Sequence, residues 1–325
     1  MSTSLELMVH QLDRHGRAER LGRLEPDELR RRGVTAARDR DEEALWALIE
    51  AYLVLRGARG GRVSPYTLRN YRAGLRMLLA WVETSGMSLL HPKPNEGAAY
   101  VRSMENGKLK PASVKVRLAA ARALFAALRW TGATDAAPFT DIRAAADRVP
   151  KHQKRKPYPE SDLQALLEKA GPQEQVIVLL GAHAGLRVSE MTSLQRSDVH
   201  LDDRNGPWLT VTGKGDKRQD VPLSRSTAAA LERWIRMTPQ LKGRVLSFTN
   251  SSSVERTLQA VCIAAGVTYS RRQVHGLRHS AGTRVYQETS DLLAVRDHLR
   301  HRDITSSEVY VDYARADKPS ITKDW

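Results

Sequence analysis

Hydrophobic side chains in the first half of the chain recur at helical spacing. In residues 42–56 (EEALWALIEAYLVLR), Leu45, Ile49, Tyr52 and Leu53 follow one another at the spacing of one helix face. A face of this kind must be covered by other elements, so the segment predicts a helix of a globular domain.

Three more helices are predicted before residue 132. Ser64 precedes a proline at the first helical position and suits an N-cap, and Gly86 ends that helix. The other two are expected at about 97–104 and 111–130. The first half of the chain therefore predicts helices only.

Residues 148–158 (RVPKHQKRKPY) interrupt this pattern. The segment holds two prolines and five basic side chains and no acidic one. Such a composition is typical of a linker between domains.

Past the linker, the pattern mixes strands with helices. Residues 208–213 (WLTVTG) and 218–223 (RQDVPL) predict a β-hairpin around a turn of lysine, glycine and aspartate. Helices are expected at about 160–170, 173–184, 226–236, 251–265, 275–288 and 290–299, with a last segment near 304–314.

These elements predict a mostly α fold with a small β-sheet. We divide the chain into an N-terminal extension (1–41), an all-helical domain (42–147), the basic linker (148–158) and an α+β domain (159–325).

The chain is strongly basic, with 52 Lys and Arg against 37 Asp and Glu and a formal net charge of +15. Residues 1–50 carry −2, residues 51–150 carry +10 and residues 151–325 carry +7. This excess predicts a polyanionic partner, and nucleic acid ranks ahead of an anionic membrane. Surfaces that face DNA should therefore lie beyond the first fifty residues.

Basic side chains of the second and fourth predicted helices and of the linker are the candidates for phosphate contacts. Few acidic residues lie among them in the sequence, which favours phosphate over ion pairing within a solvated helix face. The candidates are Arg69, Arg72, Arg76, Lys115, Arg117, Arg122, Lys154, Arg155 and Lys156.

No apolar run approaches the roughly 20 residues of a membrane-spanning helix, and the N-terminus lacks the layout of a secretory signal. The single cysteine, Cys262, excludes an internal disulfide framework, which suits a reducing cytosol. We expect a cytoplasmic, nucleoid-associated protein without a membrane partner.

Four short motifs in the second half carry the candidate chemistry. They are residues 185–190 (GLRVSE), 213–217 (GKGDK), 275–279 (HGLRH) and 299–301 (LRH), the last followed by Tyr310 nine residues after its histidine.

The transfer of a phosphodiester to a protein side chain accounts for this set of residue types. Its pentavalent transition state gathers negative charge, which Arg187 and Arg278 could hold with paired N–H donors. Lys214 on the hairpin turn could protonate the departing 5′-oxygen, and His275 or His301 could accept the attacking proton. A tyrosine hydroxyl suits the nucleophile because its phosphoester conserves the bond energy for resealing. The chemistry calls for no metal and no cofactor.

The four motifs resemble those of the tyrosine recombinase family, also called the phage integrase family. The resemblance covers roughly residues 42–315, and the family pattern is G-L-R-x-x-E, then a G-K-G hairpin, then H-x-L-R-H, then L-G-H with tyrosine nine residues on. By this resemblance the catalytic residues are Arg187, Lys214, His275, Arg278, His301 and Tyr310, with Glu190 orienting them.

The resemblance further implies a SAM-like core DNA-binding domain at 42–147 and a 3′-phosphotyrosyl intermediate. It also implies a C-shaped clamp on double-stranded DNA at a specific site. The synaptic complex would be a homo-tetramer, or a hetero-tetramer with a related recombinase.

Two residues stand apart from the pattern. Arg300 replaces the glycine that is usual before the third-box histidine, so it either strains the backbone or adds a cation that touches phosphate. His279, four residues after His275, is interpreted as a packed or hydrogen-bonded structural histidine rather than half of a zinc site.

The predicted function is site-specific DNA recombination, either Xer-like dimer resolution or integration and excision of a mobile element. A type IB topoisomerase and a non-catalytic DNA-binding relative are the alternatives. The target sequence, the need for a partner or accessory factor, and cleavage in cis or in trans stay open.

Overall fold

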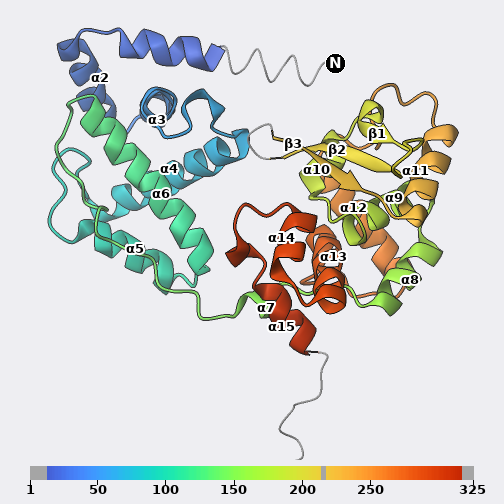
Figure 1. Cartoon of the computed structure of the whole chain (residues 1–325). Helices are drawn as coiled ribbons and strands as arrows, with labels where there is room; N and C mark the ends of the chain where they lie inside the picture. The colour runs from blue at the N-terminus through green and yellow to red at the C-terminus, as the bar shows by residue number, and fades with distance from the viewer. Residues whose placement is uncertain (1–12, 214–216, 317–325) are drawn as a thin grey trace, which may run out of the picture. The chain divides into compact units, whose positions relative to one another are not determined.

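The computed structural model describes residues 13–213 and 217–316. The chain divides into two compact units, Met1–Arg148 and Val149–Trp325 (Figure 1). Each unit has its own hydrophobic core and is described by itself.

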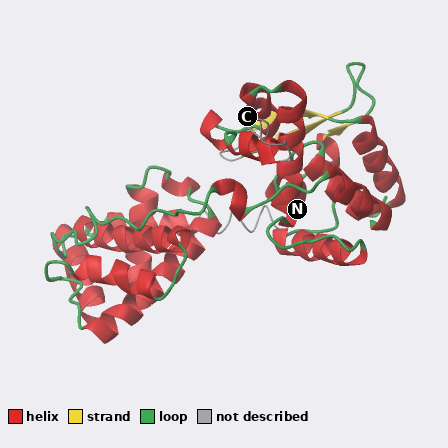
Figure 2. Cartoon of the chain, turned by 90° about the horizontal axis from the view of Figure 1, so that it is seen from below, coloured by secondary structure: helices red, strands yellow, loops and turns green. Residues whose placement is uncertain are grey.

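The described part of the first unit contains helices and loops and no strand, as the red and green ribbons of Figure 2 show. After a helix over 13–22, its elements are α2 (Pro26–Asp39), α3 (Glu42–Leu55), η1 (Gly60–Arg62), α4 (Pro65–Ser85), α5 (Glu96–Asn106) and α6 (Pro111–Trp130).

The predicted ends of α4 are confirmed by its caps. The Ser64 hydroxyl accepts a hydrogen bond from the Thr67 N–H, which satisfies one of the free donors of the first turn. Gly86 ends the helix with φ +70, a conformation that glycine adopts without strain.

The core of the first unit lies between α3, α4 and α6. Leu75 and Leu78 of α4 and Leu124 of α6 are almost fully buried in it. Phe139, from the segment after α6, packs its ring edge-on against Phe125, with the ring centroids 5.5 Å apart.

The helix α2 is an integral part of this core, although the sequence analysis set residues 1–41 apart as an extension. Leu29, Ala36 and Ala37 are buried against α3 and α6. Four arginines within a helix of 14 residues mask the short apolar face, which explains why the hydrophobic pattern did not reveal it.

The second unit contains helices and a small sheet, as predicted. Its elements are α7 (Lys151–Lys154), α8 (Glu160–Lys169), α9 (Pro172–Ala182), α10 (Val188–Ser193), η2 (Arg196–Asp198), β1 (Val199–His200), β2 (Trp208–Thr212), β3 (Arg218–Pro222), α11 (Arg225–Met237), α12 (Ser251–Ala264), α13 (Gln273–Thr289), α14 (Leu292–Leu299), η3 (Ile304–Ser306) and α15 (Val309–Ala316).

The three strands form an antiparallel sheet in the order β1-β2-β3. The predicted hairpin is confirmed, with Trp208 opposite Pro222 and Thr212 opposite Arg218. The strand β1 has only two residues, too few to show an alternating pattern in the sequence.

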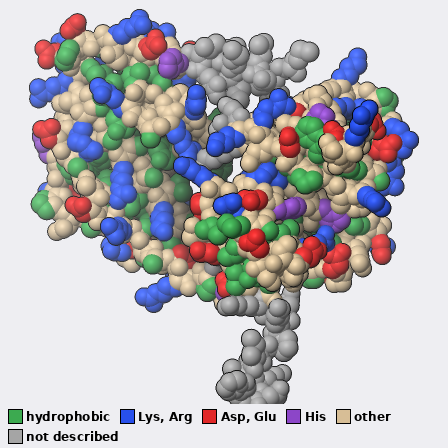
Figure 3. Space-filling model, in the orientation of Figure 1, with side chains coloured by type: hydrophobic (Ala, Val, Ile, Leu, Met, Phe, Trp, Pro, Cys, Tyr) green, Lys and Arg blue, Asp and Glu red, His purple; other side chains and the backbone are tan. Residues whose placement is uncertain are grey.

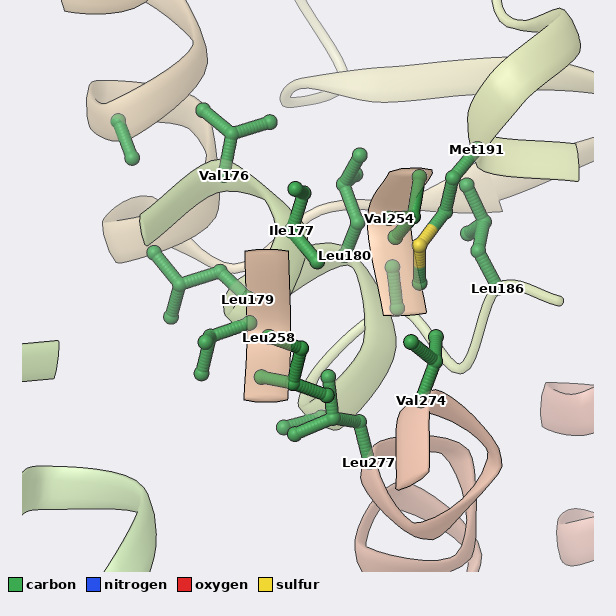
Figure 4. Packing of buried hydrophobic residues seen from close by; sticks show 14 of the residues in the cluster. Val176, Ile177, Leu179, Leu180, Leu186, Met191, Val254, Leu258, Val274 and Leu277 are labelled. Atoms are coloured by element: carbon green, nitrogen blue, oxygen red, sulfur yellow. The ribbon is translucent and has the colours of Figure 1, made fainter. Parts of the chain in front are cut away.

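The helix α9 lies at the centre of the second core, with Ile177 and Leu180 almost fully buried (Figure 4). A Cβ at Gly181 would lie 2.6 Å from the Leu277 Cβ, so glycine lets α9 and α13 approach closely. This packing fixes α13 beside the turn that follows α9, and both segments carry candidate catalytic residues.

The end of the basic segment 148–158 is fastened to the second unit. The Lys156 N–H donates to the Arg271 carbonyl at 3.0 Å. The Ser280 hydroxyl accepts from the Tyr158 N–H and donates to the Tyr158 carbonyl, both at 2.8 Å. Residues 156–158 therefore belong to the second unit rather than to a free linker.

Across the described residues, the helices are too short or too polar for any of them to traverse a lipid bilayer.

Substitution of Gly33 tests whether α2 is docked, because a docked and a detached helix predict changes in stability of opposite sign. A Cβ there would lie 2.3 Å from the Thr131 Oγ1, so we expect Gly33→Ala to lower the stability of the first unit by about 1–3 kcal/mol. In a detached helix the same change would raise helix stability by about 1 kcal/mol. Hydrogen exchange of α6 amides in the full chain measures the effect.

Gly16→Ala is the matched control. Its Cβ would meet nothing nearer than the Arg20 Nη1 at 3.7 Å, so this change should leave α6 exchange unchanged or slower. Equal slowing in both variants would contradict the docking of α2.

Candidate active site

The first motif forms a turn that holds Arg187 at the N-cap of α10. Gly185 adopts φ +61, and a Cβ there would lie 2.6 Å from the Leu299 Cδ2, so the turn packs tightly on the end of α14. The Glu190 carboxylate accepts from the Arg187 N–H at 2.8 Å and from its Nη1 at 2.7 Å. The Arg187 side chain keeps 39% of its surface exposed, which leaves it able to meet a phosphate.

Arg278 of α13 is buried between two turns of the chain, with 1% of its surface exposed. Its Nη1 donates to the Gly185 carbonyl and its Nη2 to the Leu299 carbonyl. Burial and then the charges of Arg187 and Arg300 lower the pKa of this guanidinium to about 9. Two of its five N–H groups are engaged with carbonyls, and these fix its plane.

Tyr310 of α15 is buried with 1% exposure, and its ring lies on the backbone of α13. A Cβ at Gly282 would lie 2.5 Å from the Tyr310 Cε1, so only glycine leaves room for the ring. The phenol oxygen lies 3.2 Å from the His279 Nδ1. Burial raises the pKa of Tyr310 and the nearby Arg278 only partly offsets it, so the phenol is held neutral.

His279 and His301 lie against the Tyr310 ring, and His275 lies beside His279. The rings of His275 and His279 are 4.5 Å apart, and the His301 ring stacks on Tyr310 with the centroids 6.2 Å apart. The His301 Nδ1 is also hydrogen-bonded to the Ser307 hydroxyl at 2.8 Å.

All three imidazoles have lowered pKa values. The surrounding protein and then the neighbouring cations lower the pKa to about 4 for His275, about 3 for His279 and about 4 for His301. These side chains are therefore neutral near pH 7, and a neutral ring nitrogen can accept a proton.

The contact between His279 and Tyr310 was not foreseen in the sequence. Reasoning from the motifs assigned proton acceptance to His275 or His301, while the structure hydrogen-bonds the phenol to His279. The helix α15 begins 30 residues after His279, and no local pattern shows that it returns to α13.

The helix α15 is also fastened to the segment before α8. The Tyr313 hydroxyl donates to the Arg155 carbonyl at 2.7 Å, and the His152 Nδ1 lies 3.2 Å from the Asp312 Oδ2. Tyr313 therefore has a structural partner of its own, whereas the Tyr310 hydroxyl points to the histidine.

The structure thus gathers five of the six predicted catalytic side chains in the second unit. Lys214 lies outside the described residues, which resume beyond the hairpin turn at residue 217. In the described chain, no cluster of three or more His, Cys, Asp or Glu is arranged to hold a metal ion.

Arg300 occupies the strained conformation that the sequence analysis considered. Its φ of +55 lies in the left-handed region, which costs a residue with a Cβ about 1–2 kcal/mol. Its side chain is turned inward, only 4% exposed, and pairs with Glu190 at 3.0 Å. This inward orientation does not favour the alternative expectation, in which the Arg300 guanidinium contacts a DNA phosphate.

The basic candidates of α4 have carboxylate partners that the local sequence did not reveal. Arg72 pairs with Glu42 and Glu43 of α3, and Arg76 donates to the Glu42 Oε1 at 2.7 Å. The partners lie about 30 residues away, so counting acids within α4 missed them. Arg69 of the same helix is exposed.

The basic candidates of α6 also divide into residues that have protein partners and residues that are exposed. Arg122 donates to the carbonyls of Phe139, at 3.0 Å, and Ile142, at 2.6 Å, which holds the segment after α6 in place. Arg117 is half-buried, whereas Lys115 is exposed. Figure 3 shows Lys and Arg side chains spread over the visible face of the first unit rather than gathered in one patch.

The three candidates of the basic segment 148–158 are all exposed. Arg155 also donates to the Gln273 side chain at 2.5 Å, and its charge helps to lower the pKa of His275. Lys154 and Lys156 flank it in the sequence.

Comparison with known families covers both units. Residues 159–316 match the family described as "Phage integrase family". Residues 52–132 match the family described as "Phage integrase, N-terminal SAM-like domain".

Similar curated proteins are tyrosine recombinases. "Tyrosine recombinase XerD" of Xanthomonas axonopodis pv. citri is 30% identical over 295 residues, which cover 83% of this chain and 93% of the relative. "Tyrosine recombinase XerC" of Xanthomonas campestris pv. campestris is 28% identical over 263 residues, covering 77% of this chain and 79% of the relative.

Solved structures of recombinases share the fold. XerH site-specific recombinase bound to a palindromic difH substrate matches with a TM-score of 0.66 and 16% identity, over 85% of this chain and 82% of that one. A lambda integrase tetramer bound to a Holliday junction matches with a TM-score of 0.62 and 18% identity, over 85% and 79%.

The lowered histidine pKa values predict that the second unit loses stability in mild acid. Between pH 6.5 and about 4 the unfolded chain binds protons at His279 and His301 that the folded unit does not. The free energy of unfolding should therefore be highest above pH 6.5 and fall as pH decreases through this window. Urea unfolding followed by circular dichroism at about pH 7.5 and about pH 5 measures the difference.

His279→Phe keeps an aromatic ring at the site but cannot titrate, so it should show a smaller loss between the two pH values. An unchanged pH dependence in this variant would contradict the lowered pKa of His279.

Proposed function

Because this chain belongs to the phage integrase family and is a Xer-like tyrosine recombinase, it is a site-specific DNA recombinase, and we propose that Tyr310 is its nucleophile. The observation that carries this assignment is the position of the Tyr310 phenol. It lies 3.2 Å from a neutral histidine of α13, and the charge of the buried Arg278 guanidinium acts on the same phenol.

In the proposed reaction, the Tyr310 oxygen attacks the backbone phosphorus and the bond from phosphorus to the 5′-oxygen breaks. The phenol proton passes to one of the neutral imidazoles, and the 3′-phosphotyrosyl ester keeps the strand attached to the protein. Attack by a 5′-hydroxyl on this ester reverses the step and joins the strand to its new partner.

Arg187 and Arg278 hold the non-bridging oxygens, whose charge increases in the transition state. Of the two, Arg187 is the more exposed, and the carboxylate of Glu190 orients it. His275 and His301 bond the phosphate or the attacking oxygen. Lys214 protonates the departing 5′-oxygen from the hairpin turn.

The recombinase names of the relatives favour recombination over the two alternatives. A non-catalytic relative would be expected to lack part of the catalytic set, and all six residues are present in this sequence. The type IB topoisomerase alternative is likewise not supported by the similar proteins.

We propose that the protein acts on double-stranded DNA as a tetramer, of identical subunits or together with a related recombinase. The solved lambda integrase tetramer on a Holliday junction supports this assembly by analogy of fold. The XerC and XerD relatives favour a Xer-like role over mobile-element integration, and with that role we propose that the protein acts in the cytoplasm at the nucleoid.

Contacts with DNA phosphates are proposed for the basic side chains of both units. Exposed Arg69 and Lys115 lead in the first unit, since Arg72, Arg76 and Arg122 already hold protein partners. Lys154, Arg155 and Lys156 add charge beside the catalytic residues, while half-buried Arg117 ranks last.

A suicide substrate, nicked beside the cleavage point so that the short fragment diffuses away, tests the nucleophile. We expect wild-type protein to form a covalent adduct with it, and Tyr310→Phe to form none, because the variant lacks the attacking oxygen. Denaturing gel electrophoresis of the labelled strand measures the adduct.

Tyr313→Phe is the matched control. Its hydroxyl is engaged with the Arg155 carbonyl, so this variant should still form the adduct. An adduct with Tyr310→Phe would show the nucleophile assignment to be wrong.

Arg187→Ala should separate cleavage from binding. We expect adduct formation to slow by about 100-fold or more, because the lost donors act mainly on the transition state. Affinity for an intact site, measured by gel shift at fixed salt, should change by less than about threefold.

Arg284→Ala removes another carboxylate-paired arginine of the second unit, whose partner is Glu160, and should leave both quantities unchanged. Equal losses of affinity and rate in Arg187→Ala would argue against a role in the transition state.

A further inference from the structure

The Arg300 side chain is buried at a backbone position that suits glycine. The residue ends α14 in the left-handed region, with φ +55 and ψ 48. Its side chain nevertheless turns inward and is 4% exposed. A long cation held in this way needs partners inside the protein.

Those partners belong to the turn that carries Arg187 and to the turn that carries Arg300 itself. The Arg300 Nη1 donates to the Ala184 carbonyl at 3.3 Å and to the His298 carbonyl at 3.0 Å. Its Nη2 donates to the Gly185 carbonyl at 3.1 Å and to the Glu190 Oε2 at 3.0 Å. The guanidinium therefore joins the two turns on which Arg187 and His301 are placed.

The Glu190 carboxylate is consequently shared by two arginines. One oxygen accepts from the Arg187 Nη1, and the other accepts from the Arg187 N–H and from Arg300. Glu190 is 3% exposed, so water contributes little to its neutralisation. If Arg300 were absent, Arg187 alone would have to neutralise the charge of this buried carboxylate.

Charge counting shows what this sharing changes. Arg187, Arg278, Arg300 and Glu190 together carry a net charge of +2, and without Arg300 they would carry +1. A phosphodiester carries one negative charge, and its pentavalent transition state carries more. The second positive charge therefore favours the transition state over the bound substrate.

We propose that Arg300 is a positioning residue for strand cleavage, because it neutralises Glu190, leaves the Arg187 charge to the phosphate and fixes the turn before His301. This inference rests on the proposed role of Arg187. Arg300 itself makes no contact with DNA in this proposal.

The protonation of Glu190 supplies a readout that a purely structural role would not move. Burial raises the pKa of Glu190, but the charge of Arg300 and then the bonds and charge of Arg187 bring it below its usual value. Arg278 also faces this carboxylate. Removal of Arg300 therefore raises the pKa of Glu190. A protonated Glu190 has lost its negative charge and no longer orients the Arg187 guanidinium by an ion pair.

The test compares Arg300→Met with Arg296→Met in the suicide-substrate assay. Methionine at 300 keeps an unbranched side chain as far as the position of the Arg300 Nε and removes the charged end, whereas Arg296 of the same helix pairs with Asp297. At saturating DNA we expect Arg300→Met to slow adduct formation by about ten- to a hundredfold. DNA affinity should stay unchanged, and the acid limb of the rate profile should move to higher pH. Arg296→Met should match the wild type in all three.

Arg300→Gly guards against a folding defect, because glycine suits the φ of +55. It also leaves a space of the size of the lost side chain. Guanidinium ion at a non-denaturing concentration should therefore restore part of the rate in Arg300→Gly and less in Arg300→Met, whose side chain occupies part of the space.

Either of two results would overturn the inference. One is wild-type rates with an unshifted pH profile in both variants. The other is a loss of rate in Arg300→Gly that guanidinium does not restore, or that is matched by an equal loss of DNA affinity. A wild-type protein that forms no adduct would instead reject the proposed function itself.

Discussion

The catalytic arrangement depends on the contact between two turns of the second unit, residues 184–187 and 298–301. The carbonyl groups of Gly185 and Leu299 lie in these turns, and buried backbone acceptors must be satisfied. Arg278 bonds one carbonyl from each turn. The same hydrogen bonds that satisfy the backbone therefore set the plane of a guanidinium, and the helix packing that makes α9 and α13 approach closely brings it there.

Burial then determines the protonation states around this arrangement. It raises the pKa of the Tyr310 phenol and lowers those of the surrounding histidines. A neutral phenol next to neutral imidazoles is a donor facing an acceptor, and the arginines add positive charge without competing for the proton. In the proposed reaction, the Tyr310 phenol therefore begins neutral and passes its proton to one of these imidazoles.

The sequence predicted those parts of the fold and site whose determinants lie close together along the chain. The caps of α4, the β-hairpin and the four motifs are local patterns, and those helices and strands that were predicted lie close to their expected positions. The prediction missed what depends on distant segments. The ion pair between Arg72 and the acids of α3 and the hydrogen bond between His279 and Tyr310 each join residues about 30 positions apart. The docking of α2 was missed because charged residues mask its apolar face. Arg300 combines the two cases. The sequence showed that it replaces the usual glycine, but it did not show that its side chain points inward to Glu190.

The attachment of α15 has a mechanical consequence. The helix that carries Tyr310 is tied by the Tyr313 hydroxyl and by Asp312 to residues 152–155, and this stretch continues directly into the chain that leads to the first unit. Tension along that connection would reach the helix of Tyr310 through one hydrogen bond and one histidine–carboxylate contact. The chain between the two units is thus connected directly to the helix that carries Tyr310.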